Sequence, residues 1–250
     1  MVLSLIDADS IYFRAAYVTK KKNEIRKVIN ETMREIEGQV MAQAFEEVQT
    51  MVAVKGKGNF RKDYFPFYKG NRKDLDEEMK EALNYGHSYM CDHYGAVRAD
   101  GMEADDLVAI WAHEAREAEE QYVVVGIDKD LLQIPGNHYN FKKKQHEFID
   151  DDIANYKLMV QCLTGDSTDN IPGIRGIGPK KAEGILQGIP LARRWDRVRA
   201  AHRLHNSDKL RVSFRLLKMI TSWEEFDGIG TECEALIGKQ NVLPKQEQDS

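Results

Sequence analysis

Four short runs rich in β-branched residues, separated by helical patterns, constrain the fold of this 250-residue chain more than any other feature. The runs are VLSLI (2–6), TMVAV (50–54), AVRA (96–99) and QYVVVGI (121–127). Apolar residues recur at three- and four-residue spacing within 24–48 and at the start of 104–119, and 75–94 has a mixed helical pattern. Strands that alternate with helices predict an α/β fold with a mostly parallel, doubly wound sheet.

The second part of the chain has a different character, because helical patterns follow one another there without strands between them. The predicted helices cover 151–164, 179–187, 190–203 and 207–220. We therefore expect an α/β core over 1–150 and a helical region over 151–250 that packs on this core.

Length and composition indicate a soluble chain in a reducing compartment. With 42% apolar residues, 250 residues can bury a full core. No apolar run approaches the roughly 20 residues that cross a bilayer, and the start MVLSLIDADS lacks the basic segment of a signal peptide. Cys91, Cys162 and Cys233 are odd in number and far apart, which argues against a disulfide framework or a cysteine zinc site. We expect a cytoplasmic protein without a membrane partner.

The net charge of −5, taken alone, argues against a nucleic-acid partner. The distribution of the charges argues the other way, because the basic residues are clustered. Lysine and arginine gather at 20–22, 55–62, 69–73, 142–144 and 193–218. An acidic active site embedded in basic surfaces would give this balance.

Acidic residues follow three of the four predicted strands. Asp7 and Asp9 follow the first strand, Asp100 and Glu103 the third, and Asp128 and Asp130 the fourth. In an open α/β sheet the ligand site lies beyond the carboxyl ends of the strands, so these acids should converge in one crevice. The stretch GMEADDL (101–107) opens the helix after the third strand, and its first turn can aim Glu103, Asp105 and Asp106 at the same crevice.

Six or more carboxylates in one crevice need a compensating charge, because like charges at close range raise one another's pKa. A divalent cation is the usual solution, and an all-oxygen ligand set favours Mg²⁺ or Mn²⁺. Two such ions can activate a water and stabilise the leaving oxygen during phosphodiester cleavage. The alternative interpretation is structural: Asp7 would be a turn residue, and the other acids would cap helix N-termini.

Two further acids, Asp166 and Asp169 in GDSTDN (165–170), lie just past the predicted helix over 151–164. They could complete a turn or bring more oxygens to the crevice, and periodicity does not decide between these roles. The acidic run over 150–152 precedes that helix directly, so capping and solvated charge are its simplest interpretation.

A glycine-rich segment, IPGIRGIGPKKAEGIL (171–186), leads into the next predicted helix. Gly176 and Gly178 permit close backbone approach. The free N–H groups of a helix start, with Lys180 and Lys181 in its first turn, suit the phosphates of a DNA backbone. An ordinary glycine-rich turn between two helices is the alternative.

The segment KGKGNFRKDYFPFYKGNRK (55–73) mixes cations with Phe60, Tyr64, Phe65, Phe67 and Tyr68. Cations that contact phosphates and aromatic rings that stack on unpaired bases are typical of a surface that binds single-stranded nucleic acid. In the alternative, the segment is a solvated basic loop whose aromatic rings pack into the core.

Five motifs, taken in order, resemble those of the flap endonuclease or 5′-nuclease family, which includes the 5′-nuclease domain of bacterial DNA polymerase I and phage 5′→3′ exonucleases. They are LIDADSIYFR (5–14), FPFYKGNR (65–72), MEADD (102–106), GIDKD (126–130) and GDSTDNIPGIRGIGPKKA (165–182). The resemblance implies a Rossmann-like core, a helical arch or clamp over about 60–95, and a helix–three-turn–helix element over about 160–187. In the family this last element grips duplex DNA and, in several members, holds a monovalent cation such as K⁺.

The resemblance also implies roles for single residues. Lys69 and Arg72 match the basic pair at the base of the arch that engages the scissile phosphate, with Tyr68 beside them. Arg14 matches a basic residue on the first helix, and the lysine pair of the glycine-rich segment matches contacts to the duplex backbone. The carboxylates that match the family's metal site are Asp7, Glu103, Asp105, Asp106, Asp128, Asp130, Asp166 and Asp169.

The chain departs from the family pattern at one position. Members usually carry an aspartate at the end of the second strand, where this chain has Ala53 and Val54. A missing ligand should weaken one of the two metal sites. Asp9, two residues beyond Asp7, could face the same crevice and replace it.

Together these features predict a Mg²⁺- or Mn²⁺-dependent 5′→3′ exonuclease and structure-specific flap endonuclease. Two metal ions, held chiefly by Glu103, Asp105, Asp128 and Asp130, would activate a water that attacks the phosphodiester and leaves a 5′-phosphate product. Lys69 and Arg72 would neutralise the charge that develops.

Two alternatives stand beside this prediction. One is a catalytically impaired protein that binds DNA junctions, and the other is an enzyme that cleaves RNA·DNA hybrids in the manner of RNase H. The expected partner is DNA with 5′ ends or flaps, bound by a monomer. The small chain, without a polymerase domain, favours a phage source and hence the host cytoplasm.

Overall fold

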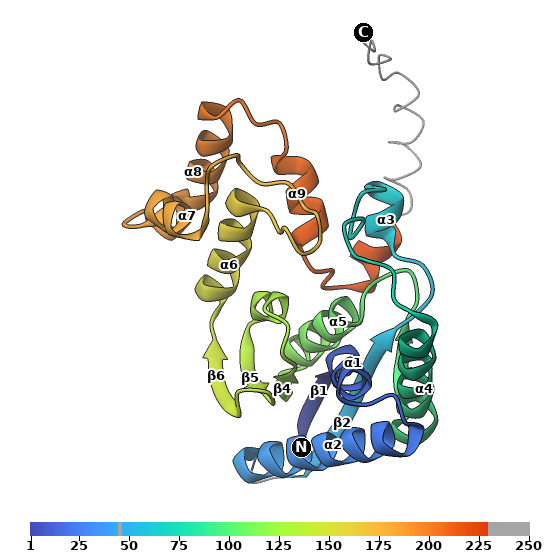
Figure 1. Ribbon diagram of the computed structural model, residues 1–250. Helices are drawn as coiled ribbons and strands as arrows, with labels where there is room; N and C mark the ends of the chain where they lie inside the picture. The colour runs from blue at the N-terminus through green and yellow to red at the C-terminus, as the bar shows by residue number, and fades with distance from the viewer. Residues whose placement is uncertain (45–46, 230–250) are drawn as a thin grey trace, which may run out of the picture.

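A computed structural model describes residues 1–44 and 47–229, and its centre is a six-stranded sheet (Figure 1). The strands lie in the order β3-β2-β1-β4-β5-β6. They are β1 (Val2–Asp7), β2 (Val48–Lys55), β3 (Val97–Ala99), β4 (Gln121–Val125), β5 (Gly136–Asn140) and β6 (Gln145–Ile149). The predicted α/β fold with a mostly parallel sheet is confirmed.

The order of the strands reverses between β1 and β4. β1 pairs in parallel with β2 on one side and with β4 on the other, while β6 runs antiparallel to β5. Asp7, the last residue of β1, pairs with Ala53 of β2. Because ligands bind sheets of this order beyond the strand ends at the point of reversal, the ends of β1 and β4 are where a site is expected.

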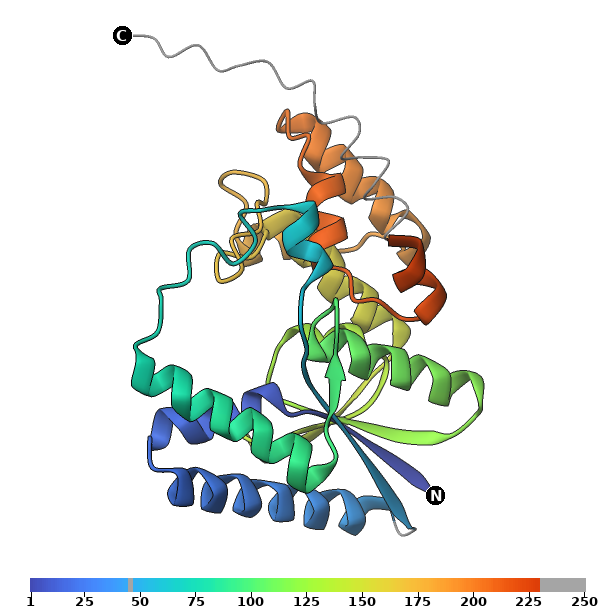
Figure 2. The ribbon, with the colours of Figure 1, turned by 90° about the vertical axis from the view of Figure 1, so that its right-hand side faces the viewer.

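Helices cover both faces of the sheet (Figure 2). One face packs against α1 (Asp9–Val18), α2 (Lys22–Ala44) and α4 (Glu77–Tyr94), and the other against α5 (Ala104–Glu117). The three- and four-residue spacing of the predicted helix over 24–48 reappears in the residues that α2 buries. They are Ile25, Ile29, Met33, Ile36 and Val40.

The second half of the chain is helical, as predicted, and has an apolar core of its own. Its helices are α6 (Asp151–Thr164), α7 (Pro179–Leu186), α8 (Leu191–Leu204) and α9 (Leu210–Leu217). They meet around a cluster that includes Leu163, Ala182, Val198 and Leu216. In Figure 1 these helices lie above the sheet. The part of the predicted region over 230–250 lies outside the described residues.

The end of α6, a turn segment over 165–178 and α7 occupy the place of the predicted helix–three-turn–helix element. An antiparallel bridge between Asp166 and Ile171 closes the first turn. A Cβ atom at Gly173 would overlap the backbone of Thr164, so this close approach of two chain segments requires glycine. Contacts within the element thus help to fix its turns.

The segment over 60–95 is where the resemblance implied a helical arch or clamp. It forms the short helix α3 (Phe60–Tyr64), a loop over 65–76 and then α4. α4 buries Met79, Leu83 and Met90 in the same apolar core as α1 and α2. Figure 2 shows the loop crossing from α3 to α4. Because the apolar face of α4 is needed in the core, the loop alone bridges the two helices.

The two described cysteines are free thiols: Cys91 is half-buried and Cys162 is buried. Cys233 lies outside the described residues. Among the described residues, no helix combines the length and the apolar content of a membrane span.

Candidate active site

Carboxylates gather at the point where the strand order reverses. Asp7 at the end of β1 is buried, with 5% of its surface exposed, and after β4 Asp130 is half-buried and Asp128 exposed. Burial raises the pKa of Asp7. The charges of Asp9, Asp128 and Glu103 raise it further, so these side chains act on one another within a single crevice.

The first turn of α5 brings Glu103 and Asp105 to this crevice, as the GMEADDL stretch predicts. Glu103 is the N-cap residue, and its backbone N–H donates to the carboxylate of Asp106 at 3.1 Å, which closes the turn. Burial raises the pKa of Asp105 well above its ordinary value, and neighbouring charges, Asp7 among them, contribute. The acids of α5 and β1 therefore share the crevice.

Asp106 has a different role from the one the resemblance implied. Its carboxylate is fully buried and forms a bidentate pair with Arg61, at 2.5 and 2.8 Å. The same two oxygens accept the backbone N–H groups of Ile220 at 3.0 Å and of Glu103 at 3.1 Å. Four hydrogen bonds occupy the acceptor positions of a carboxylate. Asp106 is thus committed to the scaffold, and its assignment as a metal ligand is corrected.

The side chain of Asp9, the first residue of α1, lies at the end of β2, the strand that lacks the family's aspartate. Its Oδ1 accepts the backbone N–H of Lys55, the last residue of β2, at 2.9 Å, and the hydroxyl of Tyr12 at 2.9 Å. Its own backbone N–H donates to Asp7 at 3.1 Å. Asp100, which was also expected in the crevice, is exposed and accepts the N–H of Lys57 in a turn. Both carboxylates therefore lie near the end of β2, but only Asp9 is hydrogen-bonded to Asp7, through its backbone N–H.

A basic pair reaches the crevice from the loop after α3. The ammonium group of Lys69 bonds to Glu103 and lies 3.6 Å from Asp169, and Arg72 donates to Asp169 at 2.6 Å. The hydroxyl of Tyr68 donates to Glu103 at 2.7 Å. Burial lowers the pKa of Lys69, but the two carboxylates outweigh burial and leave the pKa above its ordinary value, so Lys69 is a cation.

Hydrogen bonds to backbone carbonyl oxygens hold this loop against the turn segment after α6. The N–H of Lys69 donates to the carbonyl oxygen of Asp169 at 2.8 Å. The side-chain amide of Asn71 donates to the carbonyl oxygen of Ser167 at 2.7 Å, and that of Asn170 donates to the carbonyl oxygen of Phe67 at 2.8 Å. Lys69 and Asn170 both adopt positive φ, 55° and 57°. Sequence reasoning missed the two asparagines, because their contacts join segments about 100 residues apart.

The turn segment and the end of α6 also contact the residues that follow β4. Lys129 donates to Asp166 at 2.6 Å, and the amide of Gln161 bonds to Asp130. Burial raises the pKa of Asp166, but Lys129 and the backbone N–H groups of Thr168 and Asp169 together outweigh burial and leave the pKa below its ordinary value. Burial, with the charge of Asp128, raises the pKa of Asp130 to about 6. Asp166 is thus already compensated by a cation, whereas Asp130 is not.

The aromatic residues of the loop over 55–73 are mostly not available for stacking on bases. Phe60 and Tyr68 are 6% and 3% exposed, so the stacking interpretation is wrong for these two and the core-packing alternative holds. Phe67 is 67% exposed and packs edge-on against Phe65. Tyr68 acts through its hydroxyl, which bonds to Glu103.

The predicted contacts to DNA lie on exposed backbone and side chains. A Cβ atom at Gly176 or Gly178 would meet nothing within 4 Å, so the backbone there is open to an approaching group. Lys180 and Lys181 are exposed in the first turn of α7, and Arg14 is exposed on α1. The role of these residues in DNA binding stays a prediction.

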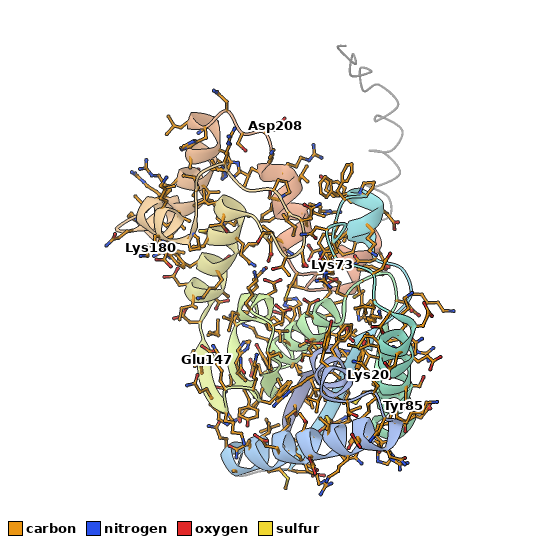
Figure 3. The ribbon with its side chains drawn as sticks, viewed as in Figure 1. Lys20, Lys73, Tyr85, Glu147, Lys180 and Asp208 are labelled. Atoms are coloured by element: carbon orange, nitrogen blue, oxygen red, sulfur yellow. The ribbon has the colours of Figure 1, made fainter. Side chains whose placement is uncertain are left out.

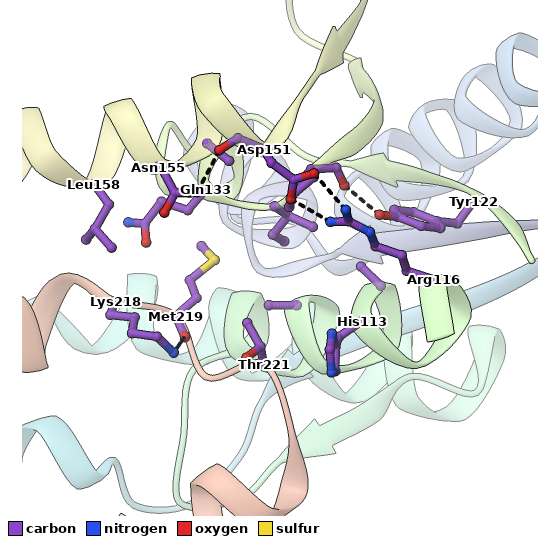
Figure 4. A pocket seen from close by; sticks show the side chains of 15 residues that line it. His113, Arg116, Tyr122, Gln133, Asp151, Asn155, Leu158, Lys218, Met219 and Thr221 are labelled. Atoms are coloured by element: carbon purple, nitrogen blue, oxygen red, sulfur yellow. Dashed lines mark hydrogen bonds and ion pairs between the residues drawn. The ribbon is translucent and has the colours of Figure 1, made fainter. Parts of the chain in front are cut away.

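The carboxylate crevice is distinct from a pocket of about 240 Å³ between α5, α6 and residues 218–221 (Figure 4). Its apolar walls include Ala109, Leu158 and Met219. Two charged side chains also line the pocket. Figure 4 shows that Arg116 and Asp151 form a bidentate ion pair with each other, with both N···O distances at 2.7 Å. None of the predicted metal ligands lines this pocket.

The oxygen donors of the crevice fit a hard divalent cation. Within the described ranges, no three acidic, histidine or cysteine side chains already surround a common point at metal-binding distance. However, burial and mutual repulsion raise the pKa values of Asp7, Asp105 and Asp130. A divalent cation would favour their charged forms, and a set made only of oxygens suits Mg²⁺ or Mn²⁺.

The sequence model of the family described as 5′-3′ exonuclease, N-terminal resolvase-like domain, matches residues 2–158. The chain belongs to this 5′-3′ exonuclease family. The matched residues include the whole sheet and the first turns of α6. The resemblance to flap endonucleases and 5′-nucleases is thereby confirmed.

Curated relatives of this exonuclease-family chain carry related names. DNA polymerase I of Rhizobium leguminosarum is 32% identical over 180 residues, which are 65% of this chain and 18% of the polymerase. Flap endonuclease Xni of Shewanella baltica strain OS155 is 32% identical over 153 residues, 55% of this chain and 57% of that protein. The chain thus spans little more than half of the length of this endonuclease in the match.

Solved structures of a phage protein share the fold. The T5 D15 protein, co-crystallised with metal ions, aligns with a TM-score of 0.67 at 18% identity, over 94% of this chain and 99% of that one. The zinc-bound T5 5′-exonuclease aligns with a TM-score of 0.65 at 18% identity, also over 94% and 99%. At this level of identity the likeness establishes a common fold.

Proposed function

We propose that this protein is a Mg²⁺- or Mn²⁺-dependent 5′ nuclease that cleaves DNA at 5′ ends and flaps and leaves 5′-phosphate products. The observation that carries the proposal is the crevice at the ends of β1 and β4. There Asp7, Asp105 and Asp130 all have raised pKa values while the cation of Lys69 lies at the edge. Membership of the 5′-3′ exonuclease family supports the same class of reaction.

The crevice would hold two divalent cations. When bound, they would activate a water and neutralise the charge of the phosphate. The ligands we propose are Asp7, Glu103, Asp105, Asp128 and Asp130, with Asp166 and Asp169 facing them from the turn segment after α6. Asp9 would take the place of the strand-two aspartate, because its carboxylate already lies at the end of β2.

Lys69 and Arg72 would bind the scissile phosphate. Asp169 contacts both cations, because its carboxylate lies 3.6 Å from the ammonium group of Lys69 and accepts a hydrogen bond from Arg72 at 2.6 Å. A fixed cation beside a buried crevice stabilises the negative charge that develops on the phosphate oxygens without reorganisation. The backbone contact between Lys69 and Asp169 keeps this cation in place as the turn segment engages DNA.

The remaining parts of the proposal concern the bound state. A monovalent cation such as K⁺ at the turn segment over 165–178 is supported by the resemblance of that segment to the family element. We also propose that the protein acts as a monomer in the cytoplasm, as expected from the sequence.

A panel of four labelled substrates tests the proposed function: a 5′-flap duplex, a blunt duplex, single-stranded DNA and an RNA·DNA hybrid. We expect Mg²⁺-dependent products with 5′-phosphate ends from the flap and from duplex 5′ ends, and none in EDTA. Flap binding without any product in Mg²⁺ or Mn²⁺ would favour the junction-binding alternative. Cleavage confined to the RNA strand of the hybrid would favour the RNase H alternative.

A further inference from the structure

The helical region carries a strongly basic surface, of which the site description above uses only Lys180 and Lys181. Residues 175–215 contain eleven arginines and lysines and only three acids, in a chain whose net charge is −5. α8 alone, LARRWDRVRAAHRL, carries five arginines and one aspartate. This concentration of cations indicates a polyanionic partner on this part of the molecule.

The arginines of α8 divide into two edges on either side of its buried face. Val198, Ala201 and His202 form the buried face. Helical periodicity places Arg193 and Arg197 together on one edge, one turn apart. The same periodicity places Arg199 and Arg203 together on the opposite edge, and all four are exposed.

The first of these edges faces α7. The Nε of Arg197 donates to the carbonyl oxygen of Ile185, near the end of α7, at 3.4 Å. The guanidinium of Arg193 has no ion-pair partner among the described residues. On the opposite edge, Arg199 lies 3.6 Å from Asp196, which offsets part of the positive charge there.

α7 extends the first edge toward the glycine-rich turn. Lys180 is exposed in its first turn, and Figure 3 shows this side chain at the outer end of α7, pointing away from the body of the protein. The open backbone of Gly176 and Gly178 lies just before it. A strip of exposed cations therefore runs from the glycine-rich turn along α7 to the facing edge of α8.

The chemistry of this strip favours the phosphates of a duplex over unpaired bases. Guanidinium groups match phosphate oxygens in a bidentate manner. Single-strand sites add exposed aromatic rings on which bases stack. Trp195, the tryptophan of α8, is half-buried and packs edge-on against Phe214, with ring centroids 5.4 Å apart.

We propose that the strip formed by Lys180, Arg193 and Arg197 binds the phosphate backbone of duplex DNA, on the side of the turn segment away from the carboxylate crevice. This inference rests on the proposed function for the identity of the polyanion. It adds α8 to the duplex-binding surface, beyond the residues that the family motifs indicate. Each phosphate that the strip neutralises should also appear in the salt dependence of binding.

The test compares Arg193→Gln/Arg197→Gln with the matched control Arg199→Gln/Arg203→Gln, which removes the same charge from the other edge of α8. Kd for a fluorescent 5′-flap duplex is measured in EDTA by anisotropy at several salt concentrations. We expect the first variant to raise Kd about tenfold and to reduce the slope of log K against log salt by roughly 1.8, since two phosphate contacts are lost. The control should stay within about twofold of the unaltered protein. Thermal melting verifies that both variants are folded.

Three results would overturn the inference: no binding of duplex by the unaltered protein, unchanged binding by Arg193→Gln/Arg197→Gln, or an equal loss in the control. An equal loss of affinity for single-stranded DNA would also overturn it, because it would indicate a single-strand site. Cleavage is measured separately in Mg²⁺. If the first variant loses duplex binding, the strip is supported even if the unaltered protein cleaves nothing. If the first variant binds and cleaves normally, the strip is refuted and the proposed nuclease function stands.

Discussion

The guanidinium of Arg61 and the carboxylate of Asp106 form a buried bidentate pair, with side-chain exposures of 3% and 0%. Arg61 also donates to the carbonyl oxygens of Leu216 and Lys218, at 2.8 and 3.2 Å. One ion pair thereby joins α3, the start of α5 and the segment after α9. Because Asp106 also accepts the N–H of Glu103, this pair fixes the turn that presents the acids of α5.

Replacing Arg61 with methionine should destabilise the protein by about 3 to 5 kcal/mol, because it leaves a buried carboxylate without its partner. The matched control is Arg116→Met, which breaks a bidentate pair with Asp151 whose members are 48% and 62% exposed. That change should cost about 1 kcal/mol or less. Urea unfolding measures both values. Equal losses in the two variants would show that the Arg61 pair does not hold the scaffold together.

Asp130→Asn should stabilise the protein in EDTA. Burial and the charge of Asp128 raise the pKa of Asp130 to about 6, above its ordinary value. The folded state therefore binds this proton more tightly than the unfolded state does, and stability is lost as pH rises through about 4 to 6. The amide avoids that loss, so the variant should be more stable by about 1 to 3 kcal/mol at pH 7.5 and nearly equal to the unaltered protein at pH 4.

The measurement is thermal or urea unfolding of both proteins in EDTA at the two pH values. The difference between the proteins is the quantity of interest, because other groups, such as Asp166 with its lowered pKa, affect both equally. A variant less stable than the unaltered protein at pH 7.5 would contradict the electrostatic account of the crevice.

Asp9→Asn should weaken the binding of Mn²⁺ by roughly tenfold or more, a typical effect of losing a carboxylate at a metal centre or next to its ligands. Asp100→Asn is the matched control, because Asp100 also accepts a backbone N–H just past β2 but is exposed. Titration of Mn²⁺, followed by electron paramagnetic resonance or calorimetry, gives both affinities without any turnover. If Asp9→Asn binds Mn²⁺ as tightly as the Asp100 variant does, Asp9 does not replace the missing strand-two aspartate.

Gly178→Ala should leave the fold intact and weaken DNA binding. Gly178 has φ near −96° and no neighbour within 4 Å of an added Cβ, so thermal stability should not change. The methyl group would hinder a phosphate from reaching the start of α7, and Kd for a duplex should rise several-fold. Gly173→Ala should instead lower the melting temperature, because its Cβ would overlap the backbone of Thr164. Normal duplex affinity of Gly178→Ala would exclude backbone approach at this position.

The sequence predicted β1 to β4 and the acids Asp7, Asp128 and Asp130 that follow β1 and β4, because β-branched strands and the residues that follow them carry local signals. It missed β5 and β6, since GNHYN and QHEFI contain few β-branched residues. It could not assign Asp106, because the partner Arg61 lies 45 positions away and no periodicity links them. The same limit applies to Tyr68, whose ring is buried although its neighbour Phe67 is exposed. Contacts between distant segments decide such roles.

The central claim is that the acids at the ends of β1 and β4 and at the start of α5 hold the divalent cations needed for phosphodiester cleavage. The most direct test is single-turnover cleavage of a 5′-flap duplex in Mg²⁺ by Asp128→Asn/Asp130→Asn, with binding of the same duplex measured in EDTA. We predict that cleavage is abolished while binding in EDTA is retained, because α7 and α8 are unchanged. Cleavage by the double variant at a rate close to that of the unaltered protein would contradict the account.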